Sequence, residues 1–393
     1  MVKKRYIAIT AVIGVAVTYL LICGFSFIKT GFGLFDSHEN EYGKFVRVGD
    51  MHYARSGHKA VLLQDGRVLI VGGASEPVAE IYDPEKRKFY KTGSMRIDRD
   101  DFTATLLQNG KVLIAGGQRG NTPLNDVELY NPNTKSFEKA PELNFSRHSH
   151  TATLLSDGRV LIVGGQGPSG EKTHTWAVKK SEIYDPKTDT FEIGPEMNIP
   201  RVKHDSILLN NGNVLIAGGY NNKRHRSAEI YDVKKNKFIQ VADMNHIRVK
   251  PQLIKLKSGK ILVVSGYGYP PNWSTAKDIK GPGKYGWAEL VEIYDPETKT
   301  FKKLIENNLS APASNAALLK NGNILFTGGD IEYRWYFKNT NGSALLNPVT
   351  KELIKGPNLH KERGGAHTGI LLNDGTVLVV GGDTAELYVP KYR

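Results

Sequence analysis

One short pattern occurs seven times along the chain and limits the fold more than any other feature. Each copy has two residues that are apolar in all copies but the fifth, which begins with Lys255, then a polar turn that ends in glycine, an apolar run and a pair of small residues, nearly always two glycines. The turns are mostly Asp-Gly or Asn-Gly, as at Asp65-Gly66. This is the strongest local signal for a β-hairpin, because such a turn needs positive φ angles. The copies occupy residues 62–73, 106–117, 154–165, 208–219, 255–266, 318–329 and 371–382.

A second block follows each pair of small residues after a loop of variable length. In the first copy it reads Ala-Glu-Ile-Tyr-Asp-Pro at 79–84, and Phe89 lies five residues past the proline. Each repeat therefore predicts four short strands, labelled a to d in chain order. Seven such repeats predict an all-β, seven-bladed β-propeller. The other copies of the block start at residues 127, 181, 228, 291, 343 and 385, and the copy at 343 is degraded.

The two ends of the repeat array complement each other. The seventh copy stops at Tyr388-Val389-Pro390 and has no strand d, whereas residues 45–51, before the first copy, resemble a strand d without a blade. We expect this N-terminal strand to complete the seventh blade, which leaves no open sheet edge. The sequence thus predicts one propeller domain over residues 45–393, preceded by a linker at 29–44.

The sequence of residues 1–28 predicts a membrane anchor. Lys3, Lys4 and Arg5 precede an uncharged, largely apolar run over residues 6–28. As a helix rising about 1.5 Å per residue, this run would be roughly 35 Å long, enough to cross a bilayer core of about 30 Å. The positive-inside rule places residues 1–5 in the cytoplasm and the propeller outside. A cleaved signal peptide and a lipid anchor on Cys23 remain as alternatives, and both also export the propeller.

The charge and the cysteine content indicate which chemistry and which partners the propeller can have. Cys23 is the only cysteine, so the propeller has no disulfide and no thiolate chemistry. The net charge of +13 favours an acidic neighbour such as a wall polymer, phospholipid headgroups or an acidic glycan. No nucleic-acid partner is expected.

The repeat resembles that of the kelch family, which has a glycine pair after strand b, a tyrosine in strand c and an aromatic residue in strand d. The resemblance covers nearly all of residues 45–392. It departs at Ser265-Gly266, where serine replaces one glycine, and in strand d, where Phe or Leu replaces the usual Trp.

The resemblance extends to galactose-oxidase-like kelch domains, whose copper-radical chemistry needs a tyrosine cross-linked to a cysteine. No cysteine exists beyond Cys23, so neither that chemistry nor a metal or other cofactor is expected. The sequence also lacks a nucleophile motif, a phosphate loop and zinc-ligand spacing. A mutarotase-like or other sugar-processing enzyme remains the alternative to a binding protein.

Two charged positions recur together in six copies. An arginine lies four residues after the Met or Leu of strand d, and a glutamate precedes the apolar-Tyr pair of strand c; the sixth copy has Ala311 and Ala344 at these positions. Joint loss suggests that the two side chains pair within a blade, because a lone buried charge would cost several kcal/mol. The alternative is a ring of arginines that binds an anionic ligand at the channel mouth. The pairs are Arg55 with Glu80, Arg99 with Glu128, Arg147 with Glu182, Arg201 with Glu229, Arg248 with Glu292, and Arg363 with Glu386.

Four histidines also recur, each just before the innermost strand a: His58, His150, His204 and His367. We expect them near the channel mouth. One histidine per blade favours structural hydrogen bonding over a metal site, although imidazole is a good transition-metal ligand.

Function is expected on the face that carries the d–a and b–c loops. The b–c loops are longest in blades three, five and six, and all four tryptophans of the chain lie in them. Variable loops on a rigid scaffold are where binding residues usually lie, and clustered Trp, Tyr and Arg are typical recognition anchors. The sequence predicts a binding module for a glycan or a surface or membrane protein; packing of the loops on themselves is the alternative. The candidate ligand-binding residues are Trp176, Tyr269, Trp273, Tyr285, Trp287, Tyr333 and Trp335.

Overall fold

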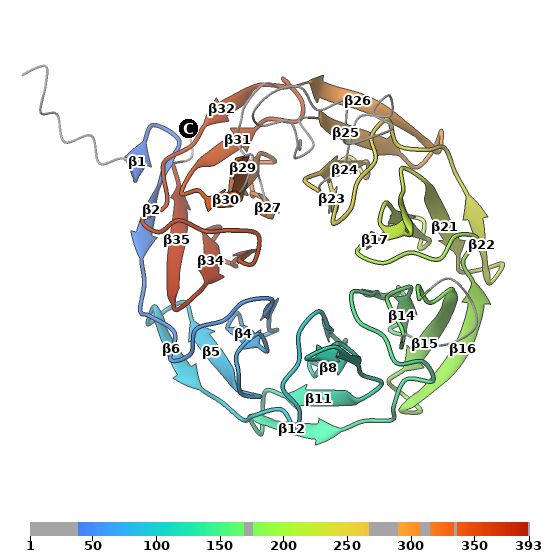
Figure 1. Cartoon of the computed structure of the whole chain (residues 1–393). Helices are drawn as coiled ribbons and strands as arrows, with labels where there is room; N and C mark the ends of the chain where they lie inside the picture. Colours follow the sequence, from blue (N-terminus) through green and yellow to red (C-terminus); the bar gives the residue numbers. More distant parts are fainter. Residues whose placement is uncertain (1–37, 169–175, 267–289, 307–314, 334–335, 392–393) are drawn as a thin grey trace, which may run out of the picture.

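The computed structural model describes residues 38–168, 176–266, 290–306, 315–333 and 336–391. Seven antiparallel sheets stand around a central axis (Figure 1), and the innermost strand of each is strand a. The prediction of an all-β, seven-bladed propeller is confirmed.

The strands of the first four blades follow chain order from the axis outward. Blade one contains β3 (Lys59–Leu62), β4 (Val68–Val71), β5 (Ala79–Asp83) and β6 (Lys88–Lys91). Blade two contains β7 (Thr103–Leu106), β8 (Val112–Ala115), β11 (Val127–Asn131) and β12 (Ser136–Lys139). Blade three contains β13 (Thr151–Leu154), β14 (Val160–Val163), β15 (Lys180–Asp185) and β16 (Thr190–Glu196). Blade four contains β17 (Asp205–Leu208), β18 (Val214–Ala217), β21 (Ala228–Asp232) and β22 (Lys237–Gln240).

The remaining blades repeat the plan, and short hairpins lie in some b–c loops. Blade five contains β23 (Gln252–Lys255), β24 (Ile261–Val264), β25 (Leu290–Asp295) and β26 (Thr300–Glu306). Blade six contains β27 (Asn315–Leu318), β28 (Ile324–Thr327), β31 (Ser343–Leu346) and β32 (Leu353–Lys355). Blade seven contains β33 (Thr368–Leu371), β34 (Val377–Gly381) and β35 (Thr384–Pro390), and is completed by β2 (Gly43–Arg47) and β1 (Glu39–Asn40). The hairpins are β9 (Gln118–Arg119) with β10 (Thr122–Pro123), β19 (Tyr220–Asn221) with β20 (Lys223–Arg224), and β29 (Asp330–Tyr333) with β30 (Tyr336–Asn339).

Strand b explains why the repeat has an uninterrupted apolar run. In β4, Leu69 and Val71 pack against blade two, whereas Val68 and Ile70 pack against blade seven. Both faces of the strand are buried, so side-chain alternation leaves no polar position. The described residues form seven such core clusters, one between each pair of neighbouring blades.

The N-terminal strand closes the ring. β2 pairs antiparallel with β35, in a register that places Phe45 opposite Tyr388. The two rings lie 5.3 Å apart, and Phe45 is buried against residues of blades six and seven. The predicted closure is confirmed. β1 and the start of β2 also belong to this sheet, so it includes residues that the sequence pattern places in the linker at 29–44.

No helix that could span a membrane occurs among the described residues. The predicted anchor at residues 6–28 lies outside them.

Candidate functional site

The six recurring arginines and glutamates lie inside the blades. In each pair an arginine Nη2 lies 2.8–3.2 Å from the glutamate Oε1, and at most 2% of either side chain is exposed. The structure thus brings together Arg55 and Glu80, Arg99 and Glu128, Arg147 and Glu182, Arg201 and Glu229, Arg248 and Glu292, and Arg363 and Glu386. These buried guanidinium groups do not line the channel mouth.

Each ion pair also fixes main-chain groups. Arg147 Nη1 donates to the carbonyl of Gly164 at 2.9 Å, and Glu182 accepts the backbone N–H of Asn144 at 2.6 Å. The arginine therefore holds the glycine pair after strand b, and the glutamate holds the d–a loop that enters the blade. In blade six the glutamate position is the buried Ala344, and Ala311 lies outside the described residues.

The recurring histidines join neighbouring blades. His204 Nε2 lies 2.9 Å from the hydroxyl of Thr151 in blade three, and His58 Nε2 lies 2.9 Å from that of Thr368 in blade seven. The corresponding contacts are His150 with Thr103 and His367 with Thr327. All four imidazoles are buried. Burial lowers the pKa of His58 and His204 to about 3 and that of His150 well below its usual range, so these rings stay neutral.

Stability is expected to fall in acid because of these rings. The unfolded chain binds a proton at His204 near pH 6.5, whereas the folded state does not until about pH 3, so falling pH favours unfolding between these values. His204→Phe copies blade two, where Phe102 occupies the equivalent place. It should flatten the dependence of the free energy of unfolding on pH between 4 and 6 by about 1.4 kcal/mol per pH unit. Urea unfolding at several pH values measures this slope, and an unchanged slope would contradict the assignment.

Only part of the predicted aromatic site lies among the described residues. Trp176 is half-buried, and its ring meets Tyr220 of the β19–β20 hairpin edge-on at 5.1 Å. The structure thereby joins the b–c loops of blades three and four. Tyr333 ends β29. The remaining candidates lie outside the described residues: Tyr269, Trp273, Tyr285, Trp287 and Trp335.

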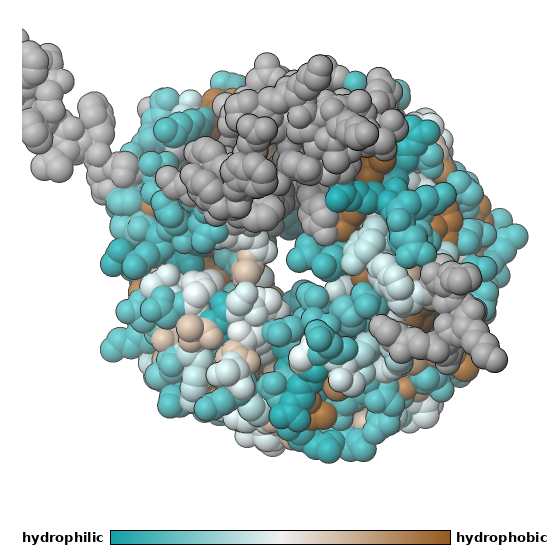
Figure 2. Space-filling view, viewed as in Figure 1, coloured by the Kyte–Doolittle hydropathy of each residue, from teal (hydrophilic) through white to brown (hydrophobic). Residues whose placement is uncertain are grey.

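A row of polar residues from blades two to five lines part of the channel mouth on the same face, and the sequence repeats did not predict it. Each lies two residues after a repeat arginine and has a left-handed backbone: Asp101, Ser149, Lys203 and Lys250, with φ angles of 50° to 55°. Backbone hydrogen bonds connect them from blade to blade, from Ser149 N to Asp101 O, from Lys203 N to Ser149 O and from Lys250 N to Lys203 O. Figure 2 shows the central opening, with hydrophilic residues along much of its edge.

Two further charges lie at the start of strand a, just inside the mouth. Asp205 accepts the N–H groups of Leu253 and Ser206 at 2.8 Å each, which ties blade four to blade five. Burial raises the pKa of Asp205 to about 6. Burial also lowers the pKa of Lys59, while the nearby Asp101 and Asp205 carboxylates oppose that shift and the Lys250 charge adds to it.

Among the described residues, the carboxylates at the mouth have hydrogen-bond donors, whereas the lysine ammonium groups have no acceptor. Asp101 Oδ2 accepts from the Ser149 hydroxyl at 3.0 Å, and His148 Nδ1 lies 3.9 Å away. His148, Ser149 and the neighbouring lysine charges hold the pKa of Asp101 below its usual range. Among the described residues, no hydrogen bond or ion pair joins the ammonium groups of Lys59, Lys203 and Lys250 to an acceptor.

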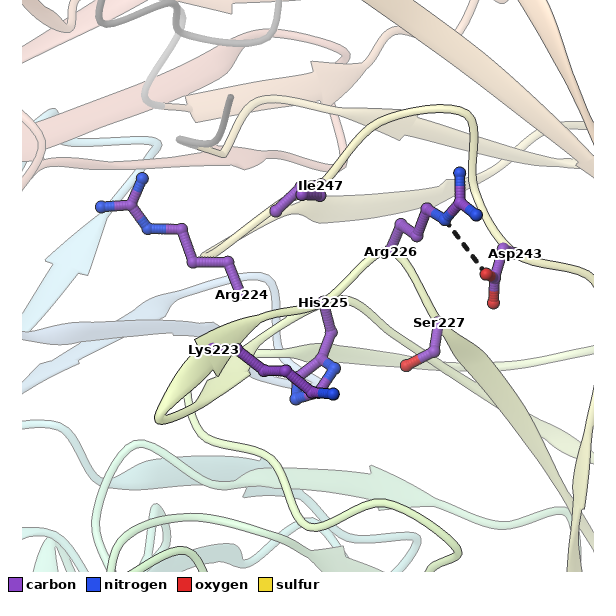
Figure 3. Close-up of a pocket in the computed structure, with 7 residues that line it drawn as sticks. All are labelled: Lys223, Arg224, His225, Arg226, Ser227, Asp243 and Ile247. Carbon is purple, nitrogen blue, oxygen red and sulfur yellow. Dashed lines mark hydrogen bonds and ion pairs between the residues drawn. The ribbon is translucent and has the colours of Figure 1, made fainter. Parts of the chain in front are cut away.

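A pocket of about 330 Å³ lies farther from the axis on blade four. It opens between the β19–β20 hairpin and the loop that leads from β22 toward β23 (Figure 3). Its lining residues are Lys223, Arg224, His225, Arg226, Ser227, Asp243 and Ile247. The basic run at 223–226 is visible in the sequence, but its partners across the pocket are not, because they come from a different loop.

Two segments of the chain match the family model for the Kelch motif, at residues 102–144 and 207–245. They correspond to blade two and to most of blade four. A search of curated proteins finds no match. Among solved structures, a novel fungal alcohol oxidase with catalytic diversity among the AA5 family, in complex with copper, is similar at a TM-score of 0.67 and 16% identity; the match covers 89% of this chain and 76% of that chain. At this identity the likeness shows the fold alone.

The described residues do not fit a copper centre. They contain no group of three His, Cys, Asp or Glu side chains that could hold a metal ion. The recurring histidines are instead paired with threonine hydroxyls between blades. The seven blades and the two matched motifs show that the chain is a seven-bladed β-propeller that contains Kelch motifs, and its fold is similar to that of the copper-bound alcohol oxidase.

Proposed function

We propose that the protein is a membrane-anchored, extracytoplasmic binding module that recognises an acidic glycan through its d–a and b–c loop face. Residues 6–28 anchor it with the N-terminus in the cytoplasm. The carrying observation is the channel mouth, where three lysines have no acceptor among the described residues while the carboxylates are already hydrogen bonded.

A ligand rich in anionic acceptors can accept hydrogen bonds from these lysine ammonium groups. Bringing the cationic Lys203 and Lys250 together costs electrostatic free energy, and an anion between them offsets that cost. The edge-on Trp176–Tyr220 pair lies on the same face, and aromatic rings offer rigid surface to sugar rings at little conformational cost. The net charge of +13 further favours an acidic partner.

A sugar-processing enzyme is the second candidate, and the fold shared with an alcohol oxidase favours it. Fold alone does not supply chemistry. Metal analysis of the purified full chain, followed by an assay for oxidation of sugar alcohols, separates this candidate from a binding module.

The double variant Lys203→Gln and Lys250→Gln should weaken binding of an oligogalacturonate by at least about tenfold, since a hydrogen bond to a charged group contributes about 1.5–3 kcal/mol. Binding of the unchanged protein should weaken as salt rises. Calorimetry on the full chain in detergent measures both effects.

The matched control is Lys86→Gln with Lys235→Gln, two lysines on the opposite face whose side chains are each 65% exposed. Equal losses in the two double variants would show that net charge alone attracts the glycan. Binding of oligoglutamate in preference to oligogalacturonate would instead favour an acidic protein as the partner.

A further inference from the structure

We propose that Lys59, just inside the channel mouth, is a nucleophile that forms an imine with a small 2-oxo acid. Such a ligand has a carbonyl group directly beside a carboxylate. The activity goes beyond the binding of a glycan, because it makes a covalent bond at one side chain of the same face.

Lys59 does not play the structural role that its position has in the other blades. The first residue of strand a bonds to the next blade in five of the other six blades, as where the Gln252 side chain exchanges two hydrogen bonds with the main chain of Ala316. In blades two, three and seven this residue is a threonine that contacts a histidine of the next blade. The residue that Lys59 would meet there is Phe102, which offers no polar atom. Lys59 therefore makes no such bond in the part of the chain that the structure describes.

The surroundings of the Lys59 amine place it in the channel. Lys59 is half-buried at the start of β3 in blade one. Its charge interacts with Asp101 in the loop that enters blade two, with Asp205 in blade four and with Lys250 in the loop that enters blade five. These blades stand around one axis (Figure 1), so a single amine can lie near groups from all of them only inside the channel. A small ligand that enters the mouth can therefore reach it.

The same surroundings favour the reactive form of the amine. Burial lowers the pKa of Lys59, and the Lys250 charge adds to this shift, while the Asp101 and Asp205 carboxylates oppose it. An amine attacks a carbonyl only without its extra proton, so a lowered pKa increases the fraction of Lys59 that can react at neutral pH.

Two further lysines at the mouth can bind the carboxylate of the ligand. Within the described ranges, neither the Lys203 nor the Lys250 ammonium has an acceptor, and the Asp101 carboxylate already accepts from the Ser149 hydroxyl at 3.0 Å. A carboxylate bound by these ammonium groups brings the adjacent carbonyl toward the amine of Lys59. The arrangement thus favours a 2-oxo acid over a neutral aldehyde.

Asp205 can transfer the protons that the reaction needs. The Lys59 nitrogen adds to the carbonyl carbon and a proton moves from nitrogen to oxygen, which gives a carbinolamine. Its hydroxyl takes a proton from the Asp205 carboxyl and leaves as water as the C=N bond forms, and the protonated imine can return a proton to the Asp205 carboxylate. Burial raises the pKa of Asp205 to about 6, so the group can both donate and accept near neutral pH. The N–H groups of Leu253 and Ser206 hold the carboxyl in place.

Treatment of the full chain in detergent with glyoxylate and cyanoborohydride tests the nucleophile. The reductant converts the imine into a stable N-carboxymethyl amine, and peptide mass spectrometry gives the rate at each lysine. Lys59 should react at least about tenfold faster than Lys86 and Lys235, whose side chains are each 65% exposed, because one pKa unit changes the free-amine fraction about tenfold. Propionaldehyde, which has no carboxylate, should show a much smaller preference. Equal rates at the three lysines, or an equal preference with both aldehydes, would overturn the proposal.

Two substitutions test the groups around the nucleophile. Lys203→Gln should slow the reaction of Lys59 with glyoxylate by about tenfold, since a hydrogen bond to a charged group contributes about 1.5–3 kcal/mol, and should leave the reaction with propionaldehyde unchanged. An equal loss with both aldehydes would contradict the role of Lys203 in binding the carboxylate.

Asp205→Asn should slow imine formation at pH 6 by about tenfold or more. The substitution also removes a negative charge that raises the pKa of Lys59, an effect that by itself would speed the reaction. A faster reaction, with an unchanged melting temperature, would therefore show that Asp205 does not transfer the proton. Oligogalacturonate binding is measured separately, so loss of the Lys59 activity alone would leave the proposed function in place.

Discussion

Replacing Arg147 with alanine is expected to lower the free energy of unfolding by about 3–5 kcal/mol, one of the largest effects available in this fold. The change leaves Glu182 as a buried charge without its cation. It also removes the donors to the carbonyls of Gly164 and Lys180, which Arg147 Nη1 contacts at 2.9 and 3.1 Å. Urea unfolding monitored by tryptophan fluorescence measures the loss.

The double variant Arg147→Ala with Glu182→Ala should recover part of that loss, because the orphaned charge is then gone. Recovery should be incomplete, since the carboxylate also accepts the N–H groups of Asn144 and Phe145. Arg159→Ala is the matched control: Arg159 pairs with Asp157 in an exposed turn, where an ion pair contributes about 0–1 kcal/mol. Strictly additive losses at Arg147 and Glu182 would show that the two side chains are not coupled.

The ion pairs could be predicted from one sequence because the repeats serve as their own comparison. Six copies retain both charges and one copy lacks both, so pairing follows from the pattern. The further contacts were not predictable, since they go to main-chain groups that every residue has. Each arginine reaches the carbonyl of the first residue in the pair after strand b, which is Gly164 in blade three and Ser265 in blade five.

The channel mouth escaped prediction for the opposite reason. The position two residues after the arginine is Gly57, Asp101, Ser149, Lys203 or Lys250 in the first five blades, so its chemistry changes from copy to copy. What these residues share is a left-handed backbone and a place near the axis. Variation among repeats at a conserved geometric position is itself a sign of a binding surface, because packing does not dictate the side chain there.

The pocket on blade four shows a second limit of sequence reasoning. The basic run at 223–226 is recognisable in the sequence, but a run of charges is as often a solvated surface. Only the fold brings Asp243 and Ile247 of the neighbouring loop against it. The long b–c loops predicted the binding residues in blades three, five and six, whereas this pocket lies at the shorter b–c loop of blade four.

Removing the N-terminal strand is expected to have a comparably large effect. A chain that begins at His52 lacks β1 and β2 and exposes β35 as an open edge, while a chain that begins at His38 keeps the closed ring. Phe45 and Met51 are 3% and 6% exposed, and burying a side chain of this kind contributes about 1.5–3 kcal/mol. The five register pairs with β35 and the hydrogen bond from Tyr388 to the carbonyl of Tyr42 are lost as well. Thermal unfolding with light scattering should show a lower melting temperature and aggregation of the shorter chain.

A peptide of residues 38–51 provides the control for this truncation. Added to the chain that begins at His52, it should restore the melting temperature by pairing with β35, because the ring needs the strand and not its covalent connection. A shuffled peptide of the same composition should have no effect, since it cannot place an aromatic ring against Tyr388 or an apolar side chain at the position of Met51. Equal melting temperatures for the two chains would mean that blades one to six and the three remaining strands of blade seven hold the ring together without the N-terminal strand. The buried interface between Phe45 and blades six and seven argues against that outcome.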